Sequence, residues 1–111
     1  MGQSVRGDVV VLNFPFSDLS QTKRRPALVL AALRGDDVIL CQITSQARSD
    51  EYSLPLESVD FTSGGLNQSS RIRPNRLFTA DEGIIVYRAG HVADGKLNEV
   101  LDRVVGILRQ S

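Results

Sequence analysis

The sequence has few of the residues that usually carry enzymatic chemistry. Its 111 residues include one cysteine, one histidine and no tryptophan. A single cysteine excludes an internal disulfide, and the place of Cys41 at the end of the apolar run Val38–Cys41 favours a buried side chain over a reactive thiol. The single histidine, His91, excludes a histidine acid/base pair and favours a loop or packing role. Without paired histidines, a cysteine cluster or a phosphate-binding glycine loop, we expect no metal and no nucleotide cofactor.

Long apolar runs and an excess of one charge are also missing. No run approaches the roughly 18 residues of a membrane span, and Met1–Arg6 lacks the regions of a signal peptide. The 13 basic residues balance 13 acidic ones, so no overall field draws the chain to a polyanion or an acidic membrane. We therefore expect a cytoplasmic protein with no membrane contact, one domain spanning residues 1–111, in which any polyanion site is local.

Short apolar segments in the first half of the chain predict strands. Residues 9–14 form a nearly continuous apolar run rich in β-branched side chains, which Pro15 ends. A second strand is expected from Pro26, since the first residue of a strand can do without a ladder donor, to about Ala32. The turn sequence Arg34–Asp37 then predicts a hairpin with a third strand over Val38–Ile43.

The second half predicts further short strands and one helix. Tyr52–Leu56 contains a proline, which favours an edge strand or an extended loop. Thr62–Gly65 is expected to form a turn, and Ile84–Tyr87 a short strand. Ser69–Arg73 is expected to form a strand that Pro74 closes. From Asp94, the expected capping residue, the period becomes helical, with an apolar stripe formed by Leu97, Val100, Leu101, Val104, Val105 and Leu108.

Together these elements predict a mainly β protein, a small and partly open barrel with a C-terminal helix.

Cationic side chains are the chemically useful groups that cluster in this chain. Two groups contain no intervening acid: Lys23, Arg24 and Arg25, and Arg71, Arg73 and Arg76. Because strand side chains repeat every two residues, Arg71 and Arg73 are expected on one face. The planar guanidinium forms paired hydrogen bonds to phosphate oxygens. The clusters therefore favour a phosphate groove, although a solvated strand face is the alternative interpretation, above all for the second group.

A polar cluster, Thr44-Ser45-Gln46, follows the third predicted strand directly. Two hydroxyls and an amide at a strand end can hydrogen-bond a phosphate or a developing oxyanion. Hydroxyl residues also end strands by bonding their own backbone. Both interpretations stay open on composition alone.

With these segments in view, the chain resembles the MazF/PemK family of toxin ribonucleases from type II toxin-antitoxin systems. The order and spacing of the matching segments are similar to the PemK-like branch. The resemblance implies an SH3-like barrel with a C-terminal α-helix, the fold of MazF, PemK and CcdB toxins. It also implies a homodimer that forms an RNA groove, and a cognate antitoxin as partner. The matching segments are Gly7–Val10, Phe14–Phe16, Arg25–Leu30, Ile43–Gln46, Arg71–Phe78 and the closing helix.

The resemblance further implies metal-independent cleavage of single-stranded RNA at a short sequence. The family's catalytic arginine falls on Arg25 and its threonine on Thr44. In this mechanism the 2′-hydroxyl of RNA attacks the adjacent phosphate, so the protein only aligns the groups and stabilises charge. The residues expected to bind RNA are Lys23, Arg24, Phe16, Ser45, Gln46, Arg48, Arg71, Arg73 and Arg76.

One segment departs from the family pattern. Some relatives carry a glutamate in the loop before the catalytic arginine, but this chain has Ser20–Thr22 there, and the nearest acid is Asp18. The polar loop Ser17–Arg24 is instead expected to close over RNA as a lid.

Two rival functions fit the same barrel. CcdB-like toxins bind DNA gyrase without catalysis, and they need a gyrase-binding C-terminal element more than a cationic groove. Arg25 with Thr44 favours the ribonuclease, and Ile107–Ser111 has no residue that singles out a gyrase binder. The second rival is a degenerate family member that binds RNA or a partner without cutting.

Overall fold

The computed structural model describes residues 3–15, 22–45 and 50–110. Within these ranges, seven strands form one antiparallel sheet and one α-helix follows them. Two short 3₁₀ helices, η1 (Ser58–Asp60) and η2 (Glu82–Ile84), stand between strands. The strands are β1 (Asp8–Pro15), β2 (Thr22–Ala32), β3 (Asp37–Thr44), β4 (Leu54–Leu56), β5 (Phe61–Gly64), β6 (Ser70–Asp81) and β7 (Ile85–Val92), and the helix is α1 (Asp94–Arg109).

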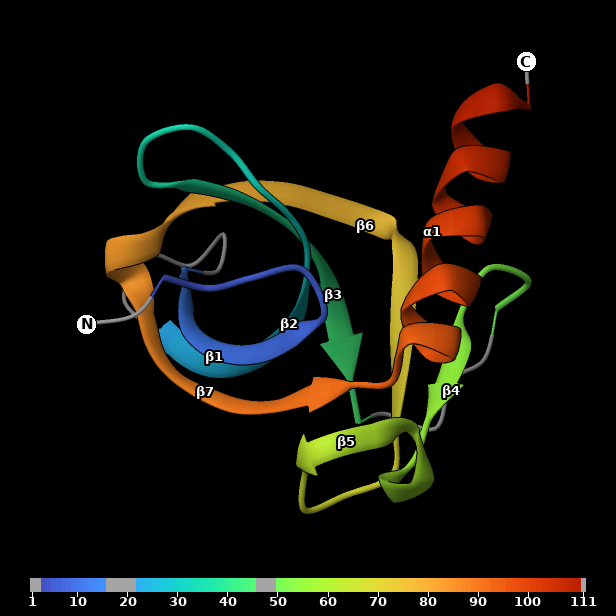
Figure 1. Ribbon diagram of the computed structural model, residues 1–111, viewed down its shortest axis with the longest axis horizontal. Coiled ribbons are helices and arrows are strands. Elements are labelled where there is room, and N and C mark those ends of the chain that lie inside the picture. Colours follow the sequence, from blue (N-terminus) through green and yellow to red (C-terminus); the bar gives the residue numbers. More distant parts are fainter. Residues whose placement is uncertain (1–2, 16–21, 46–49, 111) are drawn as a thin grey trace.

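The sheet curls into an open half-barrel with the strand order β4-β6-β3-β2-β1-β7-β5. Register shifts interrupt the pairings of β1 with β7, β2 with β3, β3 with β6 and β5 with β7. Such bulges bend a strand and increase its twist, which allows one sheet to curl strongly. Figure 1 shows β1, β2 and β7 forming the curl, with α1 outside it beside β6. The predicted mainly β, partly open barrel with a C-terminal helix is confirmed.

Side chains on opposite faces of the central strands pack into two separate apolar clusters. On β1, Val9 belongs to the cluster that includes α1, Val10 belongs to a cluster of strand residues only, and both are fully buried. Burial on both faces explains why β1 is an almost continuous apolar run. Cys41 is a fully buried member of the cluster under α1, so its predicted packing role is confirmed.

The helix begins at the expected place but is capped differently. Its N-cap residue is Ala93, and Asp94 is the first helical residue, so the prediction that Asp94 caps the helix is wrong. The Asp94 carboxylate still lies in the first turn, where the helix dipole favours an anion. No helix of the described ranges is long and apolar enough to cross a membrane. Of the predicted stripe, Leu97, Val100 and Val104 are buried, Leu101 is partly buried, and Val105 and Leu108 are exposed.

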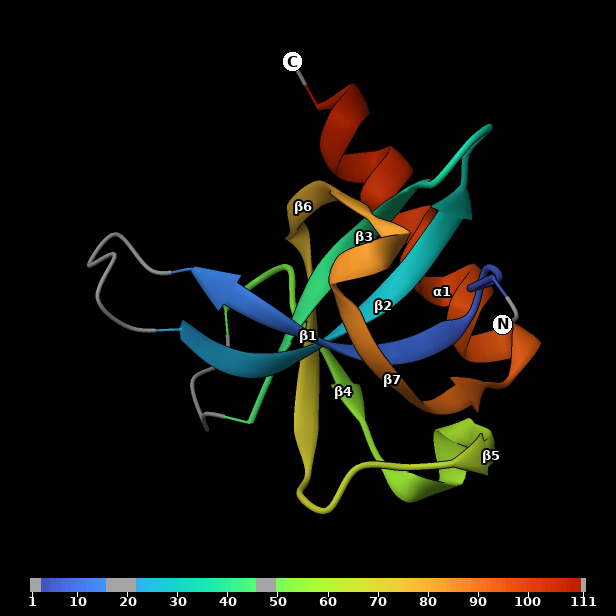
Figure 2. The same ribbon diagram turned by 90° about the vertical axis from the view of Figure 1, so that its left-hand side faces the viewer.

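Strand β2 begins at Thr22, four residues before the predicted start at Pro26. The reason is that β1 continues to Pro15 and pairs with the early part of β2, with Leu12 opposite Arg25. The cations of this segment therefore lie within a strand and not in a loop. Figure 2 shows the ends of β1 and β2 projecting together from the rest of the sheet.

Strand β6 runs through Pro74, which the sequence had predicted to end it. Opposite β3, the register passes from Gln42 paired with Arg73 to Cys41 paired with Leu77. The proline therefore lies in an irregular stretch of the ladder, where its missing N–H donor is tolerated. The prediction failed because proline excludes a regular ladder position but not a bulge.

Four further predictions concern the hairpin and the shorter elements. The β2–β3 hairpin and the edge position of β4 are confirmed. Thr62–Gly65 was predicted as a turn, but Phe61–Gly64 forms β5, which pairs with β7. Strand β7 starts one residue later than predicted and extends to Val92, because β1 and β5 pair with it on either side.

Candidate functional site

A concave site lies where β1, β2 and β7 meet the segment that leads into β6. Its volume is about 370 Å³, and we name it the β2 cavity. The strand register places Pro26 of β2, Val11 of β1 and Tyr87 of β7 opposite one another. All three line the cavity, together with Arg24 and Arg25. The predicted cationic segment thus forms one wall of a cavity with a partly apolar lining.

Arg25 is the least exposed of the three neighbouring cations on β2. It pairs in register with Leu12 of β1, its side chain is half-buried, and its Nε atom is buried. Lys23 and Arg24, by contrast, are exposed. A half-buried guanidinium has fewer orientations open to it than an exposed one, which suits a group that must contact one phosphate.

Thr44, the last residue of β3, falls in the same row of the sheet as Arg25. Ala27 pairs with Gln42, and Arg25 and Thr44 each lie two residues beyond that pair, towards the same end. Side chains two residues apart on a strand share a face. Continued by two residues, the register puts the two predicted catalytic residues on one face of adjacent strands. Thr44 is half-buried and opposite Arg71 of β6, but it is not among the described residues that line the β2 cavity.

The second cationic group has neighbours that the sequence spacing does not reveal. Arg71 and Arg73 lie opposite Thr44 and Gln42, so their predicted common face is confirmed. Arg71 donates from Nε to Ser53 Oγ at 2.8 Å and from Nη2 to the Ser53 carbonyl oxygen at 3.2 Å. These bonds tie Arg71 to the segment that precedes β4.

Arg73 forms an ion pair with Asp50 at 3.4 Å. Hydrogen bonds from the N–H groups of Tyr52 and Ser53, together with the charge of Arg73, lower the pKa of the Asp50 carboxyl. The acid that partly neutralises this cluster is therefore 23 residues away in the sequence. A phosphate at Arg73 would have to compete with this carboxylate.

The remaining predicted RNA-binding residues are dispersed. Arg76 is exposed and lines a separate cavity of about 200 Å³ beside Phe14 and Phe78, whose rings meet edge to face at 4.8 Å. Ser45 lines the β2 cavity. Phe16, Gln46 and Arg48, and most of the predicted lid loop, lie outside the described residues.

Three residues of the β2 cavity were missed in the sequence. Asn67 and Gln68 lie in the bend before β6, and Tyr87 lies on β7. One sequence signal could have pointed to the two amides. It is the short polar segment Asn67–Ser70, which directly precedes Arg71 and Arg73. No spacing rule relates Tyr87 to Arg25, because β1 stands between their strands.

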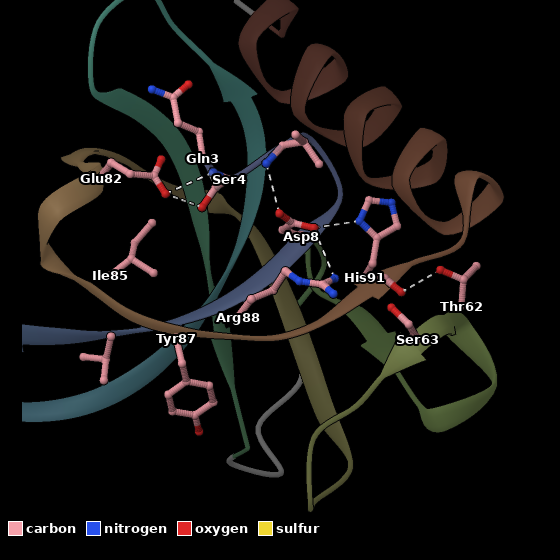
Figure 3. A pocket seen from close by; sticks show the side chains of 12 residues that line it. Gln3, Ser4, Asp8, Thr62, Ser63, Glu82, Ile85, Tyr87, Arg88 and His91 are labelled. Atoms are coloured by element: carbon pink, nitrogen blue, oxygen red, sulfur yellow. Dashed lines mark hydrogen bonds and ion pairs between the residues drawn. The ribbon is translucent and has the colours of Figure 1, made fainter. Parts of the chain in front are cut away.

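A larger cavity of about 670 Å³, the β7 cavity, shares Tyr87 with the β2 cavity, and Figure 3 shows the side chains that line it. The buried Asp8 carboxylate accepts the Val5 N–H at 2.9 Å and pairs with His91 Nδ1 at 2.8 Å and Arg88 Nη1 at 3.6 Å. Glu82 accepts both the N–H and the hydroxyl of Ser4. These contacts connect the N-terminal segment to η2 and β1 to β7, which supports the packing role expected for His91.

The described residues contain no group of three or more histidine, cysteine or acidic side chains placed to hold a metal ion. What the β2 cavity offers instead is fixed positive charge, hydroxyls and amides. Such a site can align a phosphodiester and stabilise charge on its oxygens.

Comparisons with known proteins identify related chains. Residues 5–108 match the model of a family described as PemK-like, MazF-like toxin of type II toxin-antitoxin system. A search of curated protein sequences finds no match.

Solved structures share the fold at low sequence identity. A MazE-MazF crystal structure from Deinococcus radiodurans matches with a TM-score of 0.77 and 21% identity, over 99% of this chain and 100% of the other. MazF alone from that organism gives 0.76 and 23% identity, over 97% and 98%. An endoribonuclease from a mycobacterial species gives 0.72 and 16% identity, over 97% and 93%. These likenesses show that the half-barrel is the MazF-like fold that the sequence resemblance implied.

Proposed function

The chain belongs to the PemK-like, MazF-like toxin family of type II toxin-antitoxin systems, and from that premise we propose that it is a sequence-specific endoribonuclease. Its substrate is single-stranded RNA, whose unpaired bases can be splayed out and read. The observation that carries the proposal is that Arg25 lines the β2 cavity while the register of β2 and β3, continued by two residues, puts Thr44 on the same face as Arg25. The fold is shared with a mycobacterial protein named as an endoribonuclease, which supports the same function.

In the proposed reaction the RNA supplies its own nucleophile. The 2′-hydroxyl attacks the adjacent phosphorus, the bond to the 5′-oxygen of the next nucleotide breaks, and the products are a 2′,3′-cyclic phosphate and a 5′-hydroxyl. Arg25 stabilises the negative charge that gathers on the phosphate oxygens, and the Thr44 hydroxyl hydrogen-bonds one of them. A guanidinium stays protonated at neutral pH, so we assign Arg25 electrostatic stabilisation first and proton transfer second.

We further propose that the chain acts as one domain, as a homodimer in the cytoplasm, with a cognate antitoxin as partner. The fold is shared with toxins solved in complex with MazE or with a cognate antitoxin, which supports such a partner. An extended or helical antitoxin segment with acidic character would compete with RNA for the cations of β2.

The decisive test is cleavage of single-stranded RNA in EDTA, with sequencing of the 5′-hydroxyl ends. We expect the purified protein to cut at a short motif. The substitution Arg25→Ala should lower the cleavage rate by about 100-fold or more, because it removes the main group stabilising the transition state.

Arg34→Ala is the matched control, since Arg34 is an exposed arginine in the β2–β3 turn, and it should cut normally. Full activity of Arg25→Ala would contradict the proposed mechanism. Inhibition of DNA gyrase without RNA cleavage would instead support the CcdB-like alternative.

A further inference from the structure

We propose that the β2 cavity binds one unstacked base of the RNA, with Tyr87 as its stacking surface and Asn67 and Gln68 selecting the base. The inference rests on the proposed ribonuclease function and adds residues for substrate recognition to it. Neither amide nor the tyrosine belongs to the cationic and hydroxyl residues that the sequence singled out.

Tyr87 has the position that a stacking residue requires. Its side chain is 51% exposed, and at this point β7 pairs only with β1, since β5 pairs with β7 at Gly90–Val92. It stands in register with Val11 and Pro26, which extend an apolar strip beside the ring. Any RNA base can stack on an exposed aromatic ring, because every base has a π face.

The side of β7 on which the base binds follows from charge. Tyr87 lines both the β2 and the β7 cavities. Figure 3 shows its ring directed away from Asp8 and His91. The β7 cavity contains the carboxylates of Asp8 and Glu82, and the charge of Arg88 there is paired with Asp8, so no excess of positive charge is left for a polyanion. Among the described residues that line the β2 cavity there is no carboxylate, so RNA is favoured there.

The contents of the β2 cavity suit a single nucleotide. Pro26 and Leu66, both partly exposed, supply apolar surface, and Arg24 and Arg25 supply positive charge. A volume of about 370 Å³ lies at the small end of the range for ligand sites. A base can therefore rest on the apolar surface while its phosphate meets the cations of β2.

Asn67 and Gln68 provide the means to tell one base from another. Both are exposed at the edge of the cavity, in the bend between β5 and β6. A carboxamide carries a donor and an acceptor side by side and can form two hydrogen bonds with one base edge. A stacking ring accepts any base, so the amides rather than Tyr87 should decide identity.

The first experiment measures cleavage efficiency and the cleavage motif together. Tyr87→Ala should lower kcat/KM by about 5- to 150-fold, the range found for losing one stacked base, whereas Tyr87→Phe should remain near wild type. Asn67→Ala and Gln68→Ala should lose base preference at one position of the motif and keep it elsewhere. Asn98→Ala, which removes an exposed amide on α1, is the matched control and should change neither.

Unchanged efficiency and motif in these variants would overturn the inference while leaving the ribonuclease function standing. Dissociation of a dimer by Tyr87→Ala, measured by sedimentation, would also overturn it, since the ring would then serve a subunit contact.

The second experiment does not depend on cleavage. The chain has no tryptophan and two tyrosines, so Tyr52→Phe leaves Tyr87 as the sole fluorescent side chain of this kind. An oligoribonucleotide methylated at every 2′-oxygen cannot be cut, and its binding should quench the Tyr87 emission at saturation. Quenching in a protein that cuts no RNA would support the base site and contradict the ribonuclease function. Cleavage without quenching would contradict the base site alone.

Discussion

Cys41, at the middle of β3, is an unreactive side chain that is expected to affect how the stability of the protein depends on pH. It is fully buried in the cluster beneath α1. Burial raises the pKa of its thiol from 9.0 to about 12, and a hydrogen bond with the backbone of Leu28 opposes this rise only in part. The thiol therefore stays neutral near pH 7, where a buried thiolate would be costly.

A raised thiol pKa predicts an alkaline limit to stability. Because the folded pKa exceeds the unfolded one, the contribution of Cys41 is fully present below about pH 9 and is lost as the pH rises towards 12. Urea unfolding at a series of pH values should show the free energy of unfolding falling over that window. Cys41→Ala should have a shallower fall, and parallel profiles of the two proteins would contradict the prediction.

Side-chain roles could be predicted from the sequence where the local pattern decides them. The burial of Cys41 followed from its apolar neighbours, and the common face of Arg71 and Arg73 followed from the two-residue repeat of a strand. The Arg73–Asp50 pair and the place of Tyr87 could not be predicted. Both depend on contacts between segments that only the folded sheet brings together.

Among the elements, β5 depends on glycine at position 64. Gly64 has a positive φ of 65°, and a Cβ atom there would collide with the carbonyl oxygen of Ala89 in β7. Both effects act on the same pairing of β5 with β7. Only glycine accommodates this backbone conformation together with so close an approach.

Gly64→Ala should therefore destabilise the fold by about 2–4 kcal/mol, through backbone strain and displacement of β5. Gly65→Ala is a matched control in the adjacent position, since nothing lies within 4 Å of a Cβ atom there. It should change stability by less than about 1 kcal/mol. Urea midpoints of the two variants test the difference, and equal midpoints would show that β5 tolerates a side chain.

Element boundaries were predictable where a strand's own sequence determines them. The β2–β3 hairpin and the start of α1 at Asp94 are examples. The early start of β2 and the passage of β6 through Pro74 depend on partner strands. Pairing with β1 extends β2 into residues that are too polar to predict a strand by themselves.

At the scale of the whole molecule, a formal net charge of zero means that attraction to RNA must come from local cations. Log affinity for a single strand falls with log salt concentration by about 0.7 per phosphate contacted. Lys23, exposed on β2, is expected to contact one phosphate. Lys23→Ala should therefore reduce the salt slope by about 0.7 without changing the cleavage motif.

This slope is measured by titrating an uncleavable oligoribonucleotide at several salt concentrations. Arg34→Ala again serves as the control, because Arg34 lies in the β2–β3 turn away from the β2 cavity. An identical slope for Lys23→Ala and the wild type would show that Lys23 does not contact a phosphate of the RNA.

The position of β1 between β2 and β7 also has a consequence for folding during synthesis on the ribosome. One edge of β1 pairs with β2, the next strand in the chain. The other edge can pair only after β7 has been synthesised, because Asp8 of β1 pairs with His91, which is 83 residues further along the chain. At ribosomal rates of about 5–20 residues per second, that wait lasts roughly 4–17 s. An unpaired strand edge invites association during this time. Because Tyr87 arrives on the same late strand, a nascent chain holds Arg25 long before it can form the complete β2 cavity.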